Sequence, residues 1–187
     1  MSDTVERFSN RVANYVKYRP GYPAEMMDLF RERLGLERGS VVADVGSGTG
    51  LSARPFLEAG CAVYGVEPNA VMREAAEEFL AEFPGFKSTD GTSTETTLGD
   101  ASCDLVVAAQ AFHWFEPEPT RAEFRRILKP GGYVALIWNE RQLDTTEFLR
   151  EYEKLLLKYG RDYADVRHEQ IDEAVLGGFF RADFGRA

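Results

Sequence analysis

The stretch VVADVGSGTG, residues 41–50, limits the possible folds of this chain more than any other segment. A short β-prone run that contains the acid Asp44 is followed by glycines at alternate positions: Gly46, Gly48 and Gly50. Glycine accepts backbone angles closed to other residues and lets a ligand approach the main chain. If a helix starts near Leu51, its first N–H groups face the polar part of an extended ligand. Such a turn also has a purely structural use between a strand and a helix.

Strands and helices are predicted to alternate along the chain. Apolar spacing predicts helices over 24–34, 51–59, the segment after Asn69, 121–128, and the segment after a capping box at 144–147. Apolar runs predict strands over 41–45, 62–66, 86–89, 104–109 and 133–138. Such runs are typical of parallel strands covered on both faces. We therefore expect one doubly wound α/β domain, with ligands bound beyond the carboxyl ends of its strands.

The composition and charge of the chain limit the kinds of molecule that it is expected to bind. The net charge of −9 argues against a nucleic-acid or anionic-membrane surface. No apolar run is long enough to span a membrane, and residues 1–10 lack the apolar core of a secretion signal. Cys61 and Cys103 lie in or beside apolar runs and are expected to be reduced, and no cysteine or histidine cluster suggests a metal site. We expect a cytoplasmic protein that acts on a small molecule; a homodimer is left open.

The glycine spacing separates two ligand classes. The dinucleotide fingerprint is G-x-G-x-x-G, and Leu51 stands where its last glycine should be. An NAD-type oxidoreductase is therefore disfavoured. Glu67 ends the second predicted strand, where a carboxylate suits the two hydroxyls of a ribose. The alternative for Glu67 is a solvated acid before a helix N-terminus, where a negative charge is favourable.

Four segments together resemble the class I S-adenosylmethionine-dependent methyltransferases: ADVGSGTG, YGVEPN, DLVVAAQAFHWF and ILKPGGYVALIWNE. The order and spacing match over 41–140. The segment FSNRVANYVKYRPGYP, with AFHWF, resembles a narrower branch, the small-molecule methyltransferases of the trans-aconitate and ubiquinone/menaquinone type. The resemblance implies transfer of a methyl group from S-adenosylmethionine to a small-molecule acceptor, on a Rossmann-like sheet.

The resemblance also implies a role for individual residues. The donor's methionine portion would lie on the loop from Gly46 to Gly50, which includes Ser47, with Asp44 near the ammonium group. The ribose would be held by Glu67 beside Pro68 and Asn69. The adenine would lie beside Gly91, Thr92 and Ser93, and Gln110 would face the methyl donor.

The acceptor is expected on the far side of Gln110. His113 is the candidate general base. The alternative, which we weigh equally, is that its ring makes a structural hydrogen bond. Residues 1–24 would form a lid that brings Tyr15, Tyr18 and Arg19 toward Trp114. Arg19 would bind a carboxylate or, alternatively, pin the lid by an ion pair. For the aromatic residues, plain core or lid packing is the alternative to contact with the sulfonium cation.

The expected layout is a lid over 1–24, a donor-binding core over 25–140 and a helical C-terminal region over 141–187. Relatives of the resembled family continue to an antiparallel pair of strands. In this chain only FFRADFGRA fits the first strand of that pair, so we expect the pair to be incomplete. A nucleoside-binding domain without catalytic activity is therefore a third interpretation.

Overall fold

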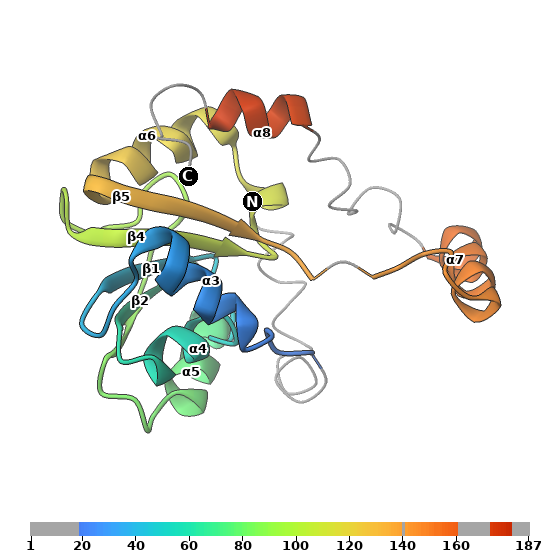
Figure 1. Cartoon of the computed structure of the whole chain (residues 1–187), viewed down its shortest axis with the longest axis horizontal. Coiled ribbons are helices and arrows are strands. Elements are labelled where there is room, and N and C mark those ends of the chain that lie inside the picture. The colour runs from blue at the N-terminus through green and yellow to red at the C-terminus, as the bar shows by residue number, and fades with distance from the viewer. Residues whose placement is uncertain (1–18, 140, 161–172, 181–187) are drawn as a thin grey trace.

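The computed structural model describes residues 19–139, 141–160 and 173–180. Its centre is a sheet of five parallel strands in the order β3-β2-β1-β4-β5 (Figure 1). The strands are β1 (Val41–Val45), β2 (Ala62–Val66), β3 (Phe86–Thr89), β4 (Cys103–Ala109) and β5 (Leu128–Ile137). The predicted doubly wound α/β fold is confirmed.

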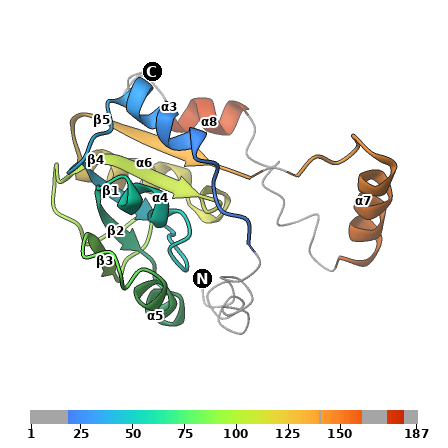
Figure 2. The same cartoon turned by 60° about the horizontal axis from the view of Figure 1, so that its bottom comes forward.

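Helices cover both faces of this sheet. The helical elements of the described residues are α3 (Glu25–Leu34), α4 (Ala53–Glu58), α5 (Ala70–Phe79), the 3-10 turn η1 (Phe112–Trp114), α6 (Pro117–Ile127), α7 (Glu147–Tyr159) and α8 (Glu173–Phe179). All but α7 lie against the sheet. Apolar residues of α3, α4 and α5 pack in one core cluster, and those of α6 and α8 pack in the other. Figures 1 and 2 both show α6 and α8 across the sheet from α4 and α5.

Alternation along the strands divides the core into two layers. Val42 belongs to the cluster of Phe30 and Phe56, whose rings lie 5.4 Å apart. Its neighbour Ala43 faces the opposite cluster, which contains Phe124. Successive strand side chains point to opposite faces, so a strand covered on both sides must be apolar at every position. Each fully buried side chain of this size contributes about 1.5–3 kcal/mol.

The helix α8 lies in the C-terminal region that was expected to be helical, but no bounds were predicted for it. Its last residue, Phe179, is 2% exposed, and its ring centroid lies 4.7 Å from that of Phe112. The first residues of FFRADFGRA therefore complete a core helix and not the expected strand; residues 181–187 lie outside the described part of the chain. Within the described residues, no antiparallel strand joins the sheet.

Two predicted boundaries around β5 need correction. The helix before it begins at Pro117 instead of residue 121, because proline suits the first turn of a helix, where its missing N–H has no partner to lose. The strand begins at Leu128, and Lys129–Gly132 forms an irregularity between the positions that pair with β4. β5 is one of the two edge strands, and its residues 133–137 are only half-buried.

The helix α7 also begins differently from the prediction. Thr146, and not Asp144, is the N-cap, and its side-chain oxygen accepts a hydrogen bond from the Leu149 N–H at 3.2 Å. Glu147 is then the first helical residue and cannot close the predicted capping box.

Candidate functional site

A cavity opens at the carboxyl ends of β1 and β4, where the order of the strands reverses. Its walls come from the segment before α3, the turn after β1, the turn after β2, and the segments after β4 and β5. The lining residues are Arg19, Pro20, Tyr22, Gly46, Ser47, Gly48, Thr49, Leu51, Ser52, Glu67, Pro68, Asn69, Met72, Ala109, Gln110, Ala111, Trp114, Phe115 and Asn139. In open α/β sheets this edge is the usual ligand position.

The glycine turn, Gly46–Gly50, forms one wall of the cavity. Gly46 has φ of 72°, and a Cβ there would lie 2.7 Å from the Ala111 Cβ, so packing alone requires glycine. Gly48 has φ of 53°, but a Cβ there would meet no atom within 4 Å. Gly46 is therefore needed by the fold, whereas Gly48 leaves its surroundings open for a ligand to approach the main chain.

Glu67 forms the next wall, at the end of β2. Its Oε2 accepts a hydrogen bond from the Gly48 N–H at 3.1 Å, and its Oε1 accepts one from the Asn69 N–H at 3.0 Å. Burial raises the pKa of Glu67, and these two N–H groups oppose that effect. A carboxylate oxygen can accept more than one hydrogen bond, so Glu67 keeps capacity for hydroxyl groups of a ligand.

Asp44 lies beneath the glycine turn and is absent from the cavity lining, and its expected position near the ligand's ammonium group stays a prediction. It is fully buried, and its Oδ2 accepts a hydrogen bond from the Ser52 hydroxyl at 2.6 Å. Its Oδ1 has no hydrogen-bond partner among the described residues. Burial, with the nearby charge of Glu67, raises the pKa of Asp44 to about 7. A buried carboxylate with an unused oxygen is compatible with a cationic ligand above the turn.

Gln110 follows β4 and takes an uncommon backbone conformation, with φ of 56°. Its side-chain Nε2 donates to the Asn139 carbonyl at 3.3 Å, and the Asn139 Nδ2 donates to the Gly21 carbonyl at 3.4 Å. These bonds connect the ends of β4 and β5 with the segment before α3. A non-glycine residue with positive φ is strained and persists only where the surrounding structure holds it in place. Such residues often occur at functional sites.

The structure brings together some of the residues that were expected to bind the acceptor. Arg19 and Trp114 both line the cavity, and Trp114 is 41% exposed. His113 does not line it; its ring lies against Trp114 at a centroid distance of 4.8 Å. The base role of His113 stays a prediction, beside the alternative of a structural role. Tyr15 and Tyr18 lie outside the described residues.

The predicted adenine segment, Gly91, Thr92 and Ser93, is absent from the cavity lining. Ser93 is buried, and its hydroxyl oxygen accepts a hydrogen bond from the Thr120 hydroxyl of α6 at 3.0 Å. The segment thus lies against α6 in this structure, and its contact with a ligand stays a prediction.

Several lining residues were not singled out from the sequence, among them Thr49, Ser52 and Met72. Thr49 lies inside the glycine turn and could have been found from its position between glycines. Ser52 and Met72 carry no local signal, because only the folded turn and α5 bring them to the cavity.

Three further observations on the described residues concern metal ions, membrane spans and cysteines. The described residues contain no group of three or more His, Cys, Asp or Glu side chains that could hold a metal ion. None of their helices has the length and apolar character needed to cross a membrane. Cys61 and Cys103 are both buried and unbridged, as predicted.

Comparison with known proteins agrees with this geometry. The model of the methyltransferase domain family matches residues 43–136, which run from β1 into β5 and include the turns after β1, β2 and β4. The chain belongs to this methyltransferase family. The methyltransferase domain therefore has its cavity where the strand order reverses. The narrower resemblance to trans-aconitate and quinone-type enzymes receives no support from this match.

Individual relatives are described as uncharacterised methyltransferases or as methyltransferase-like. An uncharacterised methyltransferase of Mycobacterium tuberculosis is 34% identical over 86% of this chain, and a methyltransferase-like protein of Schizosaccharomyces pombe is 31% identical over 84%. The match covers 61% and 60% of those two proteins, so this chain spans about three fifths of their length.

Solved structures show the same fold. A crystal structure described as a methyltransferase from an antibiotic biosynthesis pathway of Anabaena variabilis has a TM-score of 0.62 at 28% identity, covering 83% of this chain and 60% of its own. A Methanococcus maripaludis protein described as an S-adenosylmethionine-dependent methyltransferase has a TM-score of 0.65, covering 95% of this chain and 78% of its own. At 18% identity, the second likeness shows the fold alone.

Proposed function

We propose that this methyltransferase domain binds S-adenosylmethionine and transfers its methyl group to a small-molecule acceptor. The observation that carries the proposal is the position of Glu67, whose carboxylate is fixed by the N–H groups of Gly48 and Asn69 at the wall of the cavity. A fixed carboxylate with remaining lone pairs can accept hydrogen bonds from two neighbouring hydroxyls, as a ribose presents.

The rest of the cavity fits the other parts of this donor. Gly48 leaves room at the main chain, and the orphaned Asp44 Oδ1 lies beneath the turn, where a positive group above would be favoured. S-adenosylmethionine, when bound, supplies a methyl group on a sulfonium whose leaving group is a neutral thioether. The chain must then hold the acceptor in line with that group and exclude water.

The acceptor is proposed to enter beside Trp114, Gln110 and Arg19. Gln110 is held rigidly by its strained backbone and by Asn139, so its side chain positions groups with little freedom. Trp114 offers an aromatic face to the acceptor and to the sulfonium cation. His113 lies outside the lining, so the proposal gives it no proton-transfer step.

Titration calorimetry tests donor binding. We expect S-adenosylmethionine to bind and NAD not to bind. Glu67→Ala should lower donor affinity by more than tenfold, because charge-assisted hydrogen bonds worth about 1.5–3 kcal/mol each are lost. Glu67→Gln, which keeps an acceptor oxygen for one of the two local N–H groups, should also weaken binding.

The matched control is Glu74→Ala, at an exposed position of the neighbouring helix α5. It should leave affinity unchanged. Unaltered binding in both Glu67 variants would remove Glu67 from the site, and tight NAD binding would replace the methyltransferase proposal. A turnover assay with candidate acceptors then separates an enzyme from a domain that only binds the donor.

A further inference from the structure

The helix α7, Glu147–Tyr159, stands apart from the sheet and its covering helices. Figures 1 and 2 show it separated from the sheet in both views. None of its residues is buried, and the exposed fractions of Phe148 and Tyr159 are 73% and 68%. An isolated helix of 13 residues is marginal in water, so a helix of this kind usually gains its stability from packing.

The apolar side chains of α7 form one stripe. Phe148, Tyr152, Leu155 and Tyr159 follow one another at intervals of four, three and four residues, and Leu149 and Leu156 flank them. Intervals that alternate between three and four residues place side chains along the seam by which one helix packs against another. We call these six residues the α7 seam.

The order of residues along the seam is self-complementary. In an antiparallel pair with a two-fold axis between positions 153 and 154, Phe148 lies opposite Tyr159 of the second helix. Tyr152 then lies opposite Leu155 of the second helix. The same surface serves both partners, which a two-fold homodimer requires.

The charges beside the seam fit the same arrangement. Glu151 and Lys158 are seven residues apart and therefore lie on the same edge of the seam. Glu151 already contacts the Lys154 ammonium of its own chain at 2.8 Å, an exposed ion pair. In the antiparallel pair, Glu151 of each copy also faces Lys158 of the other, so two further opposite-charge contacts form. In a parallel pair these two residues would face the apolar edge of the partner instead. On the other edge, Glu153 is already paired with Arg141 of its own chain.

We propose that the α7 seam binds a second copy of this chain through an antiparallel α7–α7′ contact. This proposal does not depend on methyl transfer. If a segment of the same chain covered the seam, the order of residues along the seam would not need to be self-complementary. Charge complementarity across a two-fold axis specifically favours a second copy. A contact of two short helices is small, so the dimer should be weak and visible mainly at high protein concentration.

Sedimentation equilibrium of the 187-residue chain, over a wide range of concentration, tests the proposal. The wild-type protein should change from monomer to dimer as concentration rises. Glu151→Lys or Lys158→Glu alone should weaken dimerisation by roughly tenfold, because two attractive contacts become repulsive. The double reversal, Glu151→Lys with Lys158→Glu, should restore dimerisation to within about threefold of wild type.

Two further variants complete the experiment. Leu155→Glu places a charge in the middle of the seam and should abolish the dimer. Arg150→Glu, the matched control, reverses a charge on the opposite face of α7 and should leave dimerisation unchanged. Circular dichroism confirms that each variant keeps its helix content. A wild-type monomer at every concentration, a dimer that survives Leu155→Glu, or a double reversal that stays weak would each overturn the proposal.

Discussion

At the scale of single residues, Asp44 carries a buried carboxyl group whose ionisation opposes folding. Its pKa is raised to about 7 in the folded protein by burial and the nearby Glu67, against an ordinary value of 3.8. The folded state therefore keeps a proton that the unfolded chain releases, and the contribution of Asp44 to stability declines as pH rises from about 4 to about 7. The ionised form of Asp44 thus lowers stability, and under the proposed function a cationic ligand above the turn would favour that form.

This reasoning predicts the behaviour of Asp44→Asn, which cannot ionise but keeps an oxygen for the Ser52 hydroxyl. Its free energy of unfolding should exceed that of the wild type at pH 8, and the difference should vanish near pH 4. Urea unfolding at several pH values measures it, with Asp28→Asn on exposed α3 as the matched control. Parallel pH profiles for wild type and Asp44→Asn would show that Asp44 does not titrate in this range.

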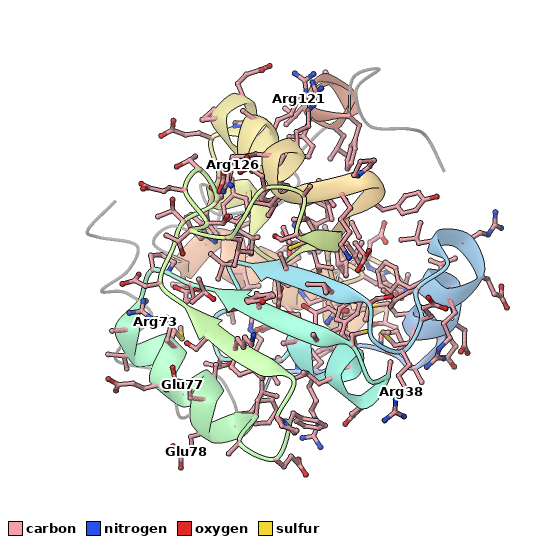
Figure 3. All side chains as sticks on the ribbon, turned by 90° about the vertical axis from the view of Figure 1, so that its left-hand side faces the viewer. Arg38, Arg73, Glu77, Glu78, Arg121 and Arg126 are labelled. Carbon is pink, nitrogen blue, oxygen red and sulfur yellow. The ribbon has the colours of Figure 1, made fainter. Side chains whose placement is uncertain are left out.

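At the scale of elements, Glu123 of α6 holds the loop between β3 and β4. Its Oε1 accepts hydrogen bonds from the Thr96 N–H at 2.8 Å and from the Arg126 Nη2 at 2.7 Å. Arg126, which Figure 3 labels beside this loop, also donates a hydrogen bond from its Nη1 to the Asp100 Oδ1 of the same loop at 2.6 Å. Burial alone would raise the pKa of Glu123, but the bonds from Arg126 and Thr96 outweigh it and hold the pKa at about 2.

Glu123→Gln should therefore lower the free energy of unfolding by about 2 kcal/mol at pH 7, since a charge-assisted contact is lost. The sign follows from the lowered pKa: the stabilisation is complete above about 4.5 and is lost as pH falls toward 2. The difference between variant and wild type should therefore shrink in acid. Urea unfolding at pH 7 and pH 3 measures both values.

The control is Glu118→Gln, which removes an exposed ion pair with Arg121 on the same helix and should lower the free energy of unfolding by less than about 1 kcal/mol. An equal cost for the two variants would contradict the role of Glu123.

At the scale of the whole molecule, stability is distributed unevenly. β1 and β4 are buried on both faces, whereas α7 buries no residue. Amide groups exchange with solvent through local opening where few contacts oppose it. In dilute solution, we expect α7 amides to exchange orders of magnitude faster than those of β4. Hydrogen exchange measured by mass spectrometry checks this. Equal protection of α7 and β4 in the dilute monomer would show that α7 packs against the domain.

The local elements were predictable from the sequence. The bounds of β1, β2 and β3 agree with the predicted strands, and the Asn69 side chain caps α5, accepting a hydrogen bond from the Val71 N–H at 3.0 Å. These features depend on apolar runs and on side-chain bonds that span a few residues, so local sequence is enough. The position of the site followed from topology, because parallel strands place their carboxyl ends at one edge.

Contacts between distant segments were decided only by the tertiary structure. The sequence alone could not show that Asp44 lies beneath the turn, that His113 lies outside the cavity, or that Phe179 completes the core. Phe179 and Phe112 are 67 positions apart, and their contact depends on how α8 meets η1 and α6. Hydrophobic burial is non-directional, so an apolar residue at a chain position does not specify which partner it packs against. Sequence patterns thus determined which elements form and at which edge a ligand binds, whereas packing decided which side chains reach that edge.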